Sequence, residues 1–292
     1  NTAFVSKAES LRTKGGISLA TTRMGGHMEF FGKDSLLDEN GKSREPLPDM
    51  VQCLHEQGYP IVWLRLGKHE ELLEVAEVAT KGAVGNALTK GSHPTQPLAE
   101  LEILEMISGS TQNHVVVYFG DGNNVALSLA QLCMLLGYKF IHSGPDIADY
   151  RLDESLITQL PGGGGFEFIE NKEIAIREAT YVCTDVHASM GDKGDGASQR
   201  KRDLAGWKVT EELFAMAPES ALFGHCLPAE RGVEVDASVL DGERSIAIPI
   251  AGCRMDTIQA IMELHMLRLS NPAVSNGCLL YTSPSPRDSM TS

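Results

Sequence analysis

The chain is short of positive charge. Its 292 residues include 25 Lys and Arg against 39 Asp and Glu, which gives a formal net charge of −14. Nucleic acids and anionic membrane surfaces attract basic proteins, so this balance argues against a general binder of either. An anionic substrate stays open, because a few clustered arginines reverse the sign of the charge locally.

Cysteine motifs and long apolar runs are also missing. No C-x-x-C pair and no zinc spacing links the six cysteines, which are Cys53, Cys133, Cys183, Cys226, Cys253 and Cys278. We therefore expect reduced thiols in an intracellular protein. No apolar stretch reaches the ~18 to 20 residues that span a bilayer. No signal peptide is visible, but the chain begins at Asn1 rather than at Met, so a targeting segment ahead of it stays open.

The apolar runs that are present alternate with segments of helical spacing. Strands are expected at 61–66, 114–119, 139–142, 166–170, 181–185 and 221–223, with a last one at 246–248, and helices at 70–80, 98–107, 125–136 and 255–269. This alternation predicts an α/β protein with doubly wound parallel sheets, and the length suits two domains. Gly and Pro predict a loop at 32–49, and the polar, Gly-rich segment 192–198 has the composition of a mobile lid.

A cysteine follows the strand at 221–223, within the run Gly224-His225-Cys226-Leu227-Pro228. Pro228 cannot donate to a sheet ladder, so the strand must stop there and leave Cys226 at its carboxyl end. Ligands of open α/β sheets bind at that end of the strands. By itself, a cysteine before a proline is more often a packing residue than a chemical group.

Two polar motifs in the first third of the chain suit an anion and a carbonyl or amide. The run from Ser10 to Lys14, SLRTK, offers hydroxyls and cations ahead of a helix-like stretch, which suits a phosphate. His93 and Gln96, in HPTQ, stand three apart and can hydrogen-bond one small polar group. Taken alone, the first motif also fits a solvated basic turn and the second a structural histidine.

Two further motifs follow predicted strands later in the chain. The run GDGNN, ending at Asn124, lacks the third glycine of a dinucleotide loop, where Val125 stands, so it argues against a nicotinamide cofactor. An asparagine at the helix start can hold a carboxylate instead. In DVHASMG, Asp185 can pair with an ammonium group and Ser189 can bind a carboxylate, although a strand-end Asp with a capping Ser is the plain structural alternative.

In this order, SLRTK, HPTQ, GDGNN, DVHASMG, HCLP and GCR resemble the motifs S-T-R-T-R, H-P-x-Q, G-D-x-N-N, D-x-x-x-S-M-G, H-C-L-P and E-N-R of the aspartate/ornithine carbamoyltransferase family. The likeness runs from about Ser10 to about Leu267, and the fourth and fifth motifs point to the ornithine-using members. It implies an enzyme that transfers the carbamoyl group of carbamoyl phosphate to the side-chain amine of L-ornithine, giving L-citrulline and phosphate. It implies no metal and no organic cofactor.

The resemblance assigns roles position by position. It implies that carbamoyl phosphate is bound by Ser10, Leu11, Arg12, Thr13, Arg65, His93, Gln96, Cys226, Leu227 and Arg254. Ornithine binding falls to Asn124, Asp185, Ser189 and Met190. The catalytic set is Arg65, His93, Asp185, Cys226 and Arg254, with Cys226 lining the amine site rather than acting as a covalent nucleophile.

The resemblance also implies an architecture. A carbamoyl phosphate-binding domain is expected at 1–104, lacking the helix and first strand ahead of Ser10, and an ornithine-binding domain at 105–250, with a cleft between them. A helix at 251–270 is expected to pack back on the first domain, followed by a disordered tail at 271–292. The usual assembly is a homotrimer, in the cytoplasm or in the matrix of a mitochondrion or plastid.

Several positions depart from the family pattern. Leu11 replaces a Thr, Lys14 an Arg, and Ser18 a Glu, while Gly252 and Cys253 replace the Glu-Asn ahead of the last arginine. These changes keep three alternatives open: transfer to N-acetylornithine, putrescine or aspartate; a non-catalytic binding protein on the same fold; and an NAD-dependent oxidoreductase, which rests only on the alternating sheet and the Gly-x-Gly of GDGNN.

Overall fold

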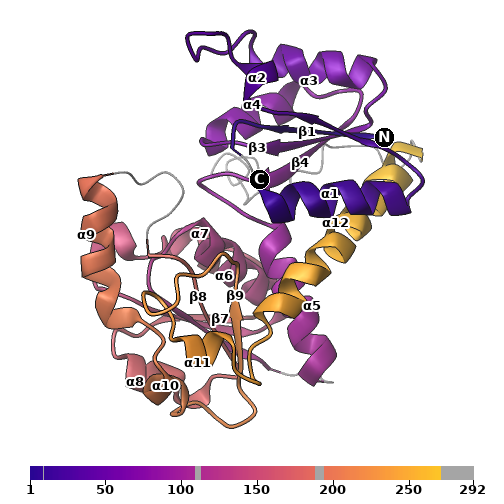
Figure 1. The fold of residues 1–292 in the computed structure, drawn as a ribbon. Coiled ribbons are helices and arrows are strands. Elements are labelled where there is room, and N and C mark those ends of the chain that lie inside the picture. Colours follow the sequence, from indigo (N-terminus) through magenta and orange to yellow (C-terminus); the bar gives the residue numbers. More distant parts are fainter. Residues whose placement is uncertain (9, 109–112, 188–193, 271–292) are drawn as a thin grey trace. The chain divides into compact units, whose positions relative to one another are not determined.

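A computed structural model describes residues 1–8, 10–108, 113–187 and 194–270 (Figure 1). Within the described residues, the chain divides into two compact units, the first comprising Asn1–Thr95 and residues 254–270, the second Gln96–Cys253. Each unit has its own parallel sheet, as the alternation of strands and helices predicted. The units join within helix α5 (Thr95–Ser108) and helix α12 (Ala247–Ser270). Among the described residues, no helix combines the length and apolarity needed to cross a bilayer.

The sheet of the first unit has four parallel strands in the order β2 (Met28–Phe31), β1 (Thr2–Ser6), β3 (Ile61–Arg65) and β4 (Ala83–Leu88). Strand β1 is central, with Thr2 paired to both Met28 and Ile61. The expectation that the first strand ahead of Ser10 is missing was therefore wrong. All five residues of β1 are buried, so this short run is a core strand.

Helices α1 (Leu11–Arg23), α2 (Lys33–Leu36), α3 (Leu47–Glu56) and α4 (His69–Val78) flank this sheet (Figure 1). The loop expected at 32–49 is in part wrong, because α2 and the start of α3 lie within it. Pro46 and Pro48 flank the first residue of α3, where a missing N–H costs nothing because no carbonyl would accept it. The core formed by α3, α4 and the sheet includes Ala3, Val5, Met50, Val51, Leu54, Val62, Leu64, Leu72, Val75 and Val84.

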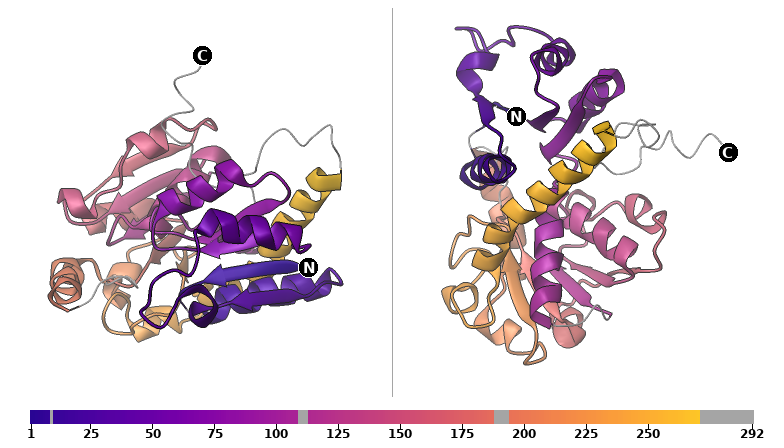
Figure 2. Two further views of the ribbon diagram at one scale, coloured as in Figure 1. Left: turned by 90° about the horizontal axis from the view of Figure 1, so that it is seen from above. Right: turned by 90° about the vertical axis from the view of Figure 1, so that its right-hand side faces the viewer.

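Helix α12 lies beside α1 within the first unit (Figure 2). Arg23 Nη1 donates to Asp256 Oδ1 at 2.9 Å, and Thr21 Oγ1 contacts Met262 Sδ at 3.8 Å. The last helix therefore packs back on the first domain, as expected. The strand expected at 246–248 was wrong, because the sheet continues only to a single bridge at Ser245. Helix α12 then begins at Ala247, since the apolar residues that follow bury themselves at helical spacing.

The sheet of the second unit has five parallel strands in the order β7 (Gly165–Phe168), β6 (Lys139–Ser143), β5 (Val115–Phe119), β8 (Tyr181–Thr184) and β9 (Leu222–His225). Strand order reverses on the two sides of β5, which makes its carboxyl end a topological switch point. Its alternate residues enter separate cores: Val116 and Tyr118 pack on one face of the sheet, Val117 and Phe119 on the other.

The second unit contains α5, α6 (Asn124–Leu136), α9 (Asp195–Leu204), and the one-turn helices α7 (Ser155–Thr158), α8 (Lys172–Ala175), α10 (Glu211–Phe214) and α11 (Ala237–Leu240). Short 3₁₀ turns lie at Ala148–Tyr150, Ile176–Glu178 and Ala205–Trp207. Helix α9 begins within the segment expected to be a lid, while 188–193 and the expected tail 271–292 lie outside the described residues.

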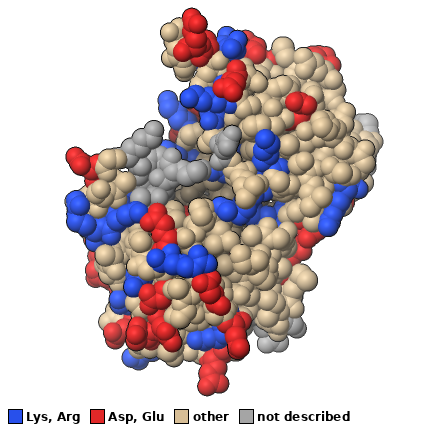
Figure 3. Space-filling view, in the orientation of Figure 1, with Lys and Arg blue, Asp and Glu red and all other residues tan. Residues whose placement is uncertain are grey.

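Figure 3 shows Lys and Arg interspersed with Asp and Glu on the surface that it displays.

A glycine in β9 leaves the space that the Tyr181 side chain fills. A Cβ added at Gly224 would lie 1.8 Å from the Tyr181 hydroxyl oxygen. We expect Gly224→Ala to lower the free energy of unfolding by about 1–3 kcal/mol, because overpacking forces the ring out of place. Urea denaturation measures the change. The control Gly196→Ala, in helix α9 with open space around it, should leave stability unchanged or raise it; equal effects of the two substitutions would contradict the prediction.

Candidate active site

In the first unit, strand β1 is followed by the N-terminus of helix α1. Ser10 is the N-cap of α1, and its side-chain oxygen accepts a hydrogen bond from the Thr13 N–H at 3.4 Å. The unbonded N–H groups of the first helical turn and the helix dipole favour an anion at this position. Arg12 is half-buried in this turn, and Leu11, which stands where the family has a Thr, is 87% exposed.

Thr13 joins two buried arginines. Its Oγ1 accepts hydrogen bonds from Arg65 Nη1, at the end of β3, at 3.5 Å and from Arg254 Nη2 at 3.3 Å. The same nitrogen of Arg254 also donates to Thr95 Oγ1 at 3.2 Å. Two threonine hydroxyls thus orient Arg254, although Gly252 and Cys253 replace the Glu-Asn of the family pattern.

His93 lies beside these arginines and is itself buried, with 4% of its surface exposed. Burial holds its pKa well below the usual value of 6.5, and the positive charges of Arg254, Arg65 and Arg12 lower it further. The imidazole is therefore neutral at neutral pH and can donate a hydrogen bond without carrying charge. A cluster of three cations and one neutral donor suits a phosphate group next to a carbonyl.

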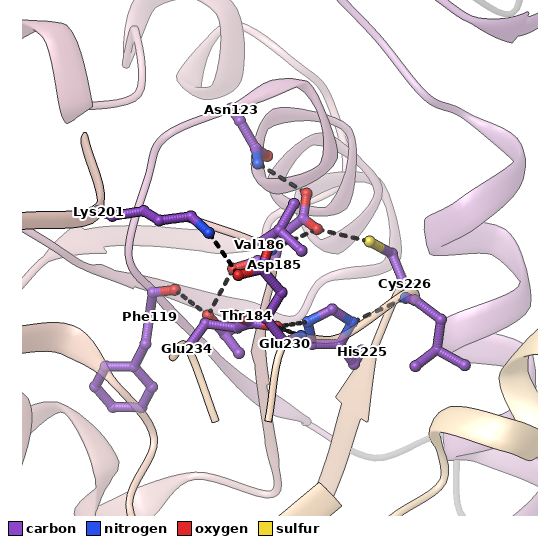
Figure 4. A network of polar contacts seen from close by, with 11 residues as sticks. Phe119, Asn123, Thr184, Asp185, Val186, Lys201, His225, Cys226, Glu230 and Glu234 are labelled. Carbon is purple, nitrogen blue, oxygen red and sulfur yellow. Dashed lines mark hydrogen bonds and ion pairs between the residues drawn. The ribbon is translucent and has the colours of Figure 1, made fainter. Parts of the chain in front are cut away.

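In the second unit, a carboxylate at the end of β8 is held by three donors (Figure 4). Asp185 Oδ1 accepts from the Val186 N–H at 2.7 Å and from Cys226 Sγ at 2.8 Å. Its Oδ2 accepts from Asn123 Nδ2 at 2.9 Å. Asn123 caps α6 with its other side-chain atom, the Oδ1 that accepts from Val125 and Ala126. None of these partners is a cation, so the carboxylate keeps its negative charge available to a ligand.

Cys226 stands at the end of β9, as the sequence predicted. Leu227 follows in the left-handed region with φ of 53°, ahead of a cis Leu227–Pro228 bond. His225 holds this turn, because its Nδ1 accepts from the Leu227 N–H at 2.8 Å while its Nε2 lies 3.4 Å from Glu234 Oε1 (Figure 4). Cys226 Sγ donates to Asp185 Oδ1, and its role as a thiol lining the amine site stays a prediction.

Among the residues that the structure describes, one group brings three metal-ligand types together. Ligand atoms of Asp185, His225 and Cys226 lie within 4.8 Å of one another. Each is already engaged by protein: both Asp185 oxygens accept hydrogen bonds, the Cys226 thiol donates one of these, and His225 Nδ1 accepts from Leu227.

The predicted residues that the structure describes are divided between the two units. The first unit holds Ser10, Leu11, Arg12, Thr13, Arg65, His93 and Arg254, and the second holds Gln96, Asn124, Asp185, Cys226 and Leu227. Ser189 and Met190 lie outside the described residues. The individual roles of all these residues stay predictions.

Four further residues hold predicted site residues in place, directly or through a neighbour, and were not predicted from the sequence. They are Thr95, Asn123, His225 and Glu234. Asn123 carries the N-cap signal, an Asn directly before an apolar helix, which could have identified it. Glu234 gave no local signal, since only the fold brings it to His225.

Comparison with known proteins identifies one family over most of the chain. Sequence models of the aspartate/ornithine carbamoyltransferase family match residues 2–105, as the carbamoyl-P binding domain, and 112–265, as the Asp/Orn binding domain. The ornithine carbamoyltransferase of Acidothermus cellulolyticus is 33% identical over 265 residues, which cover 89% of this chain and 82% of that protein. The chloroplastic ornithine carbamoyltransferase of Pisum sativum is 34% identical over 261 residues, covering 88% and 67%.

Solved structures of ornithine carbamoyltransferases have the same fold as this chain. The ornithine carbamoyltransferase from Pyrococcus furiosus superposes with a TM-score of 0.82 at 30% identity, over 91% of this chain and 84% of that one. The enzyme from Thermus thermophilus gives 0.78 at 30% identity, over 89% and 84%.

The buried, neutral His93 makes stability depend on pH. Because its pKa is lower in the folded chain, the unfolded chain binds more protons below about pH 6.5, and stability falls as pH falls. We expect His93→Gln to flatten the slope of unfolding free energy against pH between 7 and 5, by at most about 1.4 kcal/mol per pH unit. Urea denaturation across this range measures the slope. The exposed His27→Gln serves as the control; a slope that is the same in wild type and His93→Gln would contradict the prediction.

Proposed function

The chain belongs to the aspartate/ornithine carbamoyltransferase family, and we propose that it transfers the carbamoyl group of carbamoyl phosphate to the side-chain amine of L-ornithine. The products are L-citrulline and phosphate. The observation that carries this proposal is the cluster of Arg65, Arg254 and neutral His93 around Thr13 at the N-terminus of α1.

The first unit supplies the groups for carbamoyl phosphate. The helix N-terminus capped by Ser10 and the positive charges of Arg12, Arg65 and Arg254 complement the phosphate. As the bond between the carbamoyl carbon and the phosphate oxygen breaks, negative charge grows on the leaving phosphate, and these groups stabilise it. Because the cations are fixed before the reaction, they need no rearrangement during it.

The carbonyl oxygen of the carbamoyl group also gains negative charge when the amine attacks. Arg65 and Arg254 meet at the Thr13 hydroxyl, and His93 lies beside both. We assign these three side chains to the developing oxyanion. A neutral His93 donates a hydrogen bond there without releasing a proton to the amine, which must itself stay unprotonated to attack. The proton that the amine loses as the new C–N bond forms leaves with the phosphate.

The second unit supplies the groups for the amino acid. Asp185, held by Asn123, Val186 and Cys226, pairs with the α-ammonium of ornithine, and the Cys226 thiol lines the approach of the side-chain amine. The family resemblance adds Asn124, Ser189, Met190 and Leu227 to the amino acid and carbamoyl sites. An unneutralised Asp185 favours a free α-amino group over N-acetylornithine, in which the α-nitrogen carries no charge.

The proposal is tested by incubating the purified chain with carbamoyl phosphate and each of ornithine, N-acetylornithine, putrescine and aspartate. Mass spectrometry identifies the carbamoylated product. We expect citrulline from ornithine and little product from the others. Product from putrescine but not ornithine would contradict the role of Asp185, and carbamoyl phosphate binding without any product would favour a binding protein. The homotrimer implied by the family resemblance is part of the same proposal.

Arg65 is the first residue to replace on the phosphate side. We expect Arg65→Ala to lower kcat by about 100-fold or more, because one fixed donor to an oxyanion is worth roughly that factor. Steady-state kinetics with saturating ornithine measures the change. Arg23→Ala, which removes an exposed arginine on α1, is the control and should retain wild-type kcat. Near-normal turnover by Arg65→Ala would refute the assignment.

Replacing Asp185 tests the proposed amino acid site. Asp185→Asn keeps the size of the side chain and an oxygen for Val186 and Cys226, but removes the charge. We expect kcat/KM for ornithine to fall by about 100-fold, from the loss of a charged hydrogen bond, with carbamoyl phosphate affinity nearly unchanged. Asp241→Asn, on an exposed pair with Arg231, is the control. An equal loss toward both substrates would indicate misfolding instead.

A further inference from the structure

The second unit buries a carboxylate that the proposed mechanism does not use. Glu100, on α5, has 2% of its surface exposed. Its Oε1 accepts a hydrogen bond from Gln96 Nε2 at 2.7 Å, one helical turn earlier, and its Oε2 accepts from the Tyr181 hydroxyl at 3.0 Å. Buried acidic groups are costly unless both oxygens are satisfied, and these two donors satisfy them.

The bond to Glu100 decides which end of the Gln96 amide is available. An ionised carboxylate only accepts hydrogen bonds, so Gln96 must turn its NH₂ group toward it. The amide is planar, and its Oε1 therefore points away from Glu100. Gln96 is fully buried, and within the described part of the chain this oxygen has no hydrogen-bond partner. A buried acceptor in this state gains from any donor that reaches it.

We infer that Glu100 is a positioning residue, which holds the Gln96 amide so that its oxygen accepts a hydrogen bond from the NH₂ group of the carbamoyl moiety. This inference rests on the proposed function and on the family resemblance, which implies that Gln96 binds carbamoyl phosphate. The carbamoyl group has N–H donors on one side and a carbonyl acceptor on the other. By fixing the amide, Glu100 determines that Gln96 binds the nitrogen side of the carbamoyl group.

The surroundings of Glu100 hold this arrangement in place and make it depend on pH. The ionisable groups facing it are Tyr181 and Cys183 on β8, Asp185 after it, His225 on β9 and Cys133 on α6. Burial, with a smaller contribution from the Asp185 charge, raises the pKa of Glu100 to about 7, against the hydrogen bonds from Gln96 and Tyr181 and the effect of His225. Above that pH Glu100 only accepts. Below it, the protonated acid can donate to Gln96 Oε1, and the amide orientation is lost.

Glu100→Gln tests the inference, because a neutral amide of the same size can donate to Gln96 Oε1. The matched control is Glu105→Gln on the same helix, where the carboxylate also accepts from a tyrosine, Tyr138. At pH 8 we expect Glu100→Gln to raise KM for carbamoyl phosphate about 10-fold, with a smaller change in kcat. Inhibition by inorganic phosphate should be unchanged, because phosphate has no NH₂ group. Glu105→Gln should behave as wild type.

The pH profile gives a readout that a purely structural role would not move. Wild-type KM for carbamoyl phosphate should rise as pH falls through about 7, and this step should vanish in Glu100→Gln. Tyr181→Phe removes a hydrogen bond that lowers the pKa of Glu100, so it should move the step to higher pH.

The outcomes separate this inference from the proposed function. No citrulline from the unmodified chain would overturn the proposed function and the Gln96 assignment with it. Turnover by the unmodified chain, with an unaltered KM and pH profile in Glu100→Gln, would overturn the inference alone. A parallel weakening of phosphate and carbamoyl phosphate in Glu100→Gln would also overturn it, since it would mark a general distortion of the site.

Discussion

Parallel strands place their carboxyl ends at one edge of a sheet, and the candidate site depends on this constraint. In the first unit β1 leads into the Ser10 cap, β3 ends at Arg65 and β4 precedes His93. In the second unit the ends of β5, β8 and β9 bring Asn123, Asp185 and Cys226 into hydrogen-bond contact. Residues that are 62 and 41 positions apart in the chain thereby become neighbours. Each sheet edge collects the polar groups that one kind of ligand requires.

The strand ends of the first sheet carry the positive charge of arginines, and those of the second carry the negative charge of Asp185. Neutral groups hydrogen-bond to these charged side chains. The hydroxyl groups of Thr13 and Thr95 accept hydrogen bonds from Arg254. Around Asp185 the donors are an amide, a thiol and a backbone N–H, which leave its negative charge in place. A phosphate suits the first edge and an ammonium group the second. The chain has a net charge of −14, yet it presents a local cationic site.

Much of this organisation could be predicted from the sequence, because apolar runs and strand-end motifs are local signals. The strands around β5 and the positions of Arg65, Asp185 and Cys226 followed from them. Strand β1 was missed although all five of its residues are buried, and the start of α3 was missed because prolines usually mark loops. The bond between Glu100 and Tyr181 joins residues 81 positions apart. Only the packing of α5 against β8 creates it, so no local pattern could have predicted it.

We propose that the strand ends of each sheet bind a different substrate, and hydrogen–deuterium exchange with ligand titration tests this most directly. Carbamoyl phosphate alone should slow exchange in peptides that contain Ser10–Thr13, Arg65 and His93. Adding L-norvaline, which is ornithine without its side-chain amine, should then slow exchange in peptides around Asn123, Asp185 and Cys226. Carbamoyl phosphate protection confined to the second group, or norvaline protection confined to the first, would contradict the assignment of the two edges.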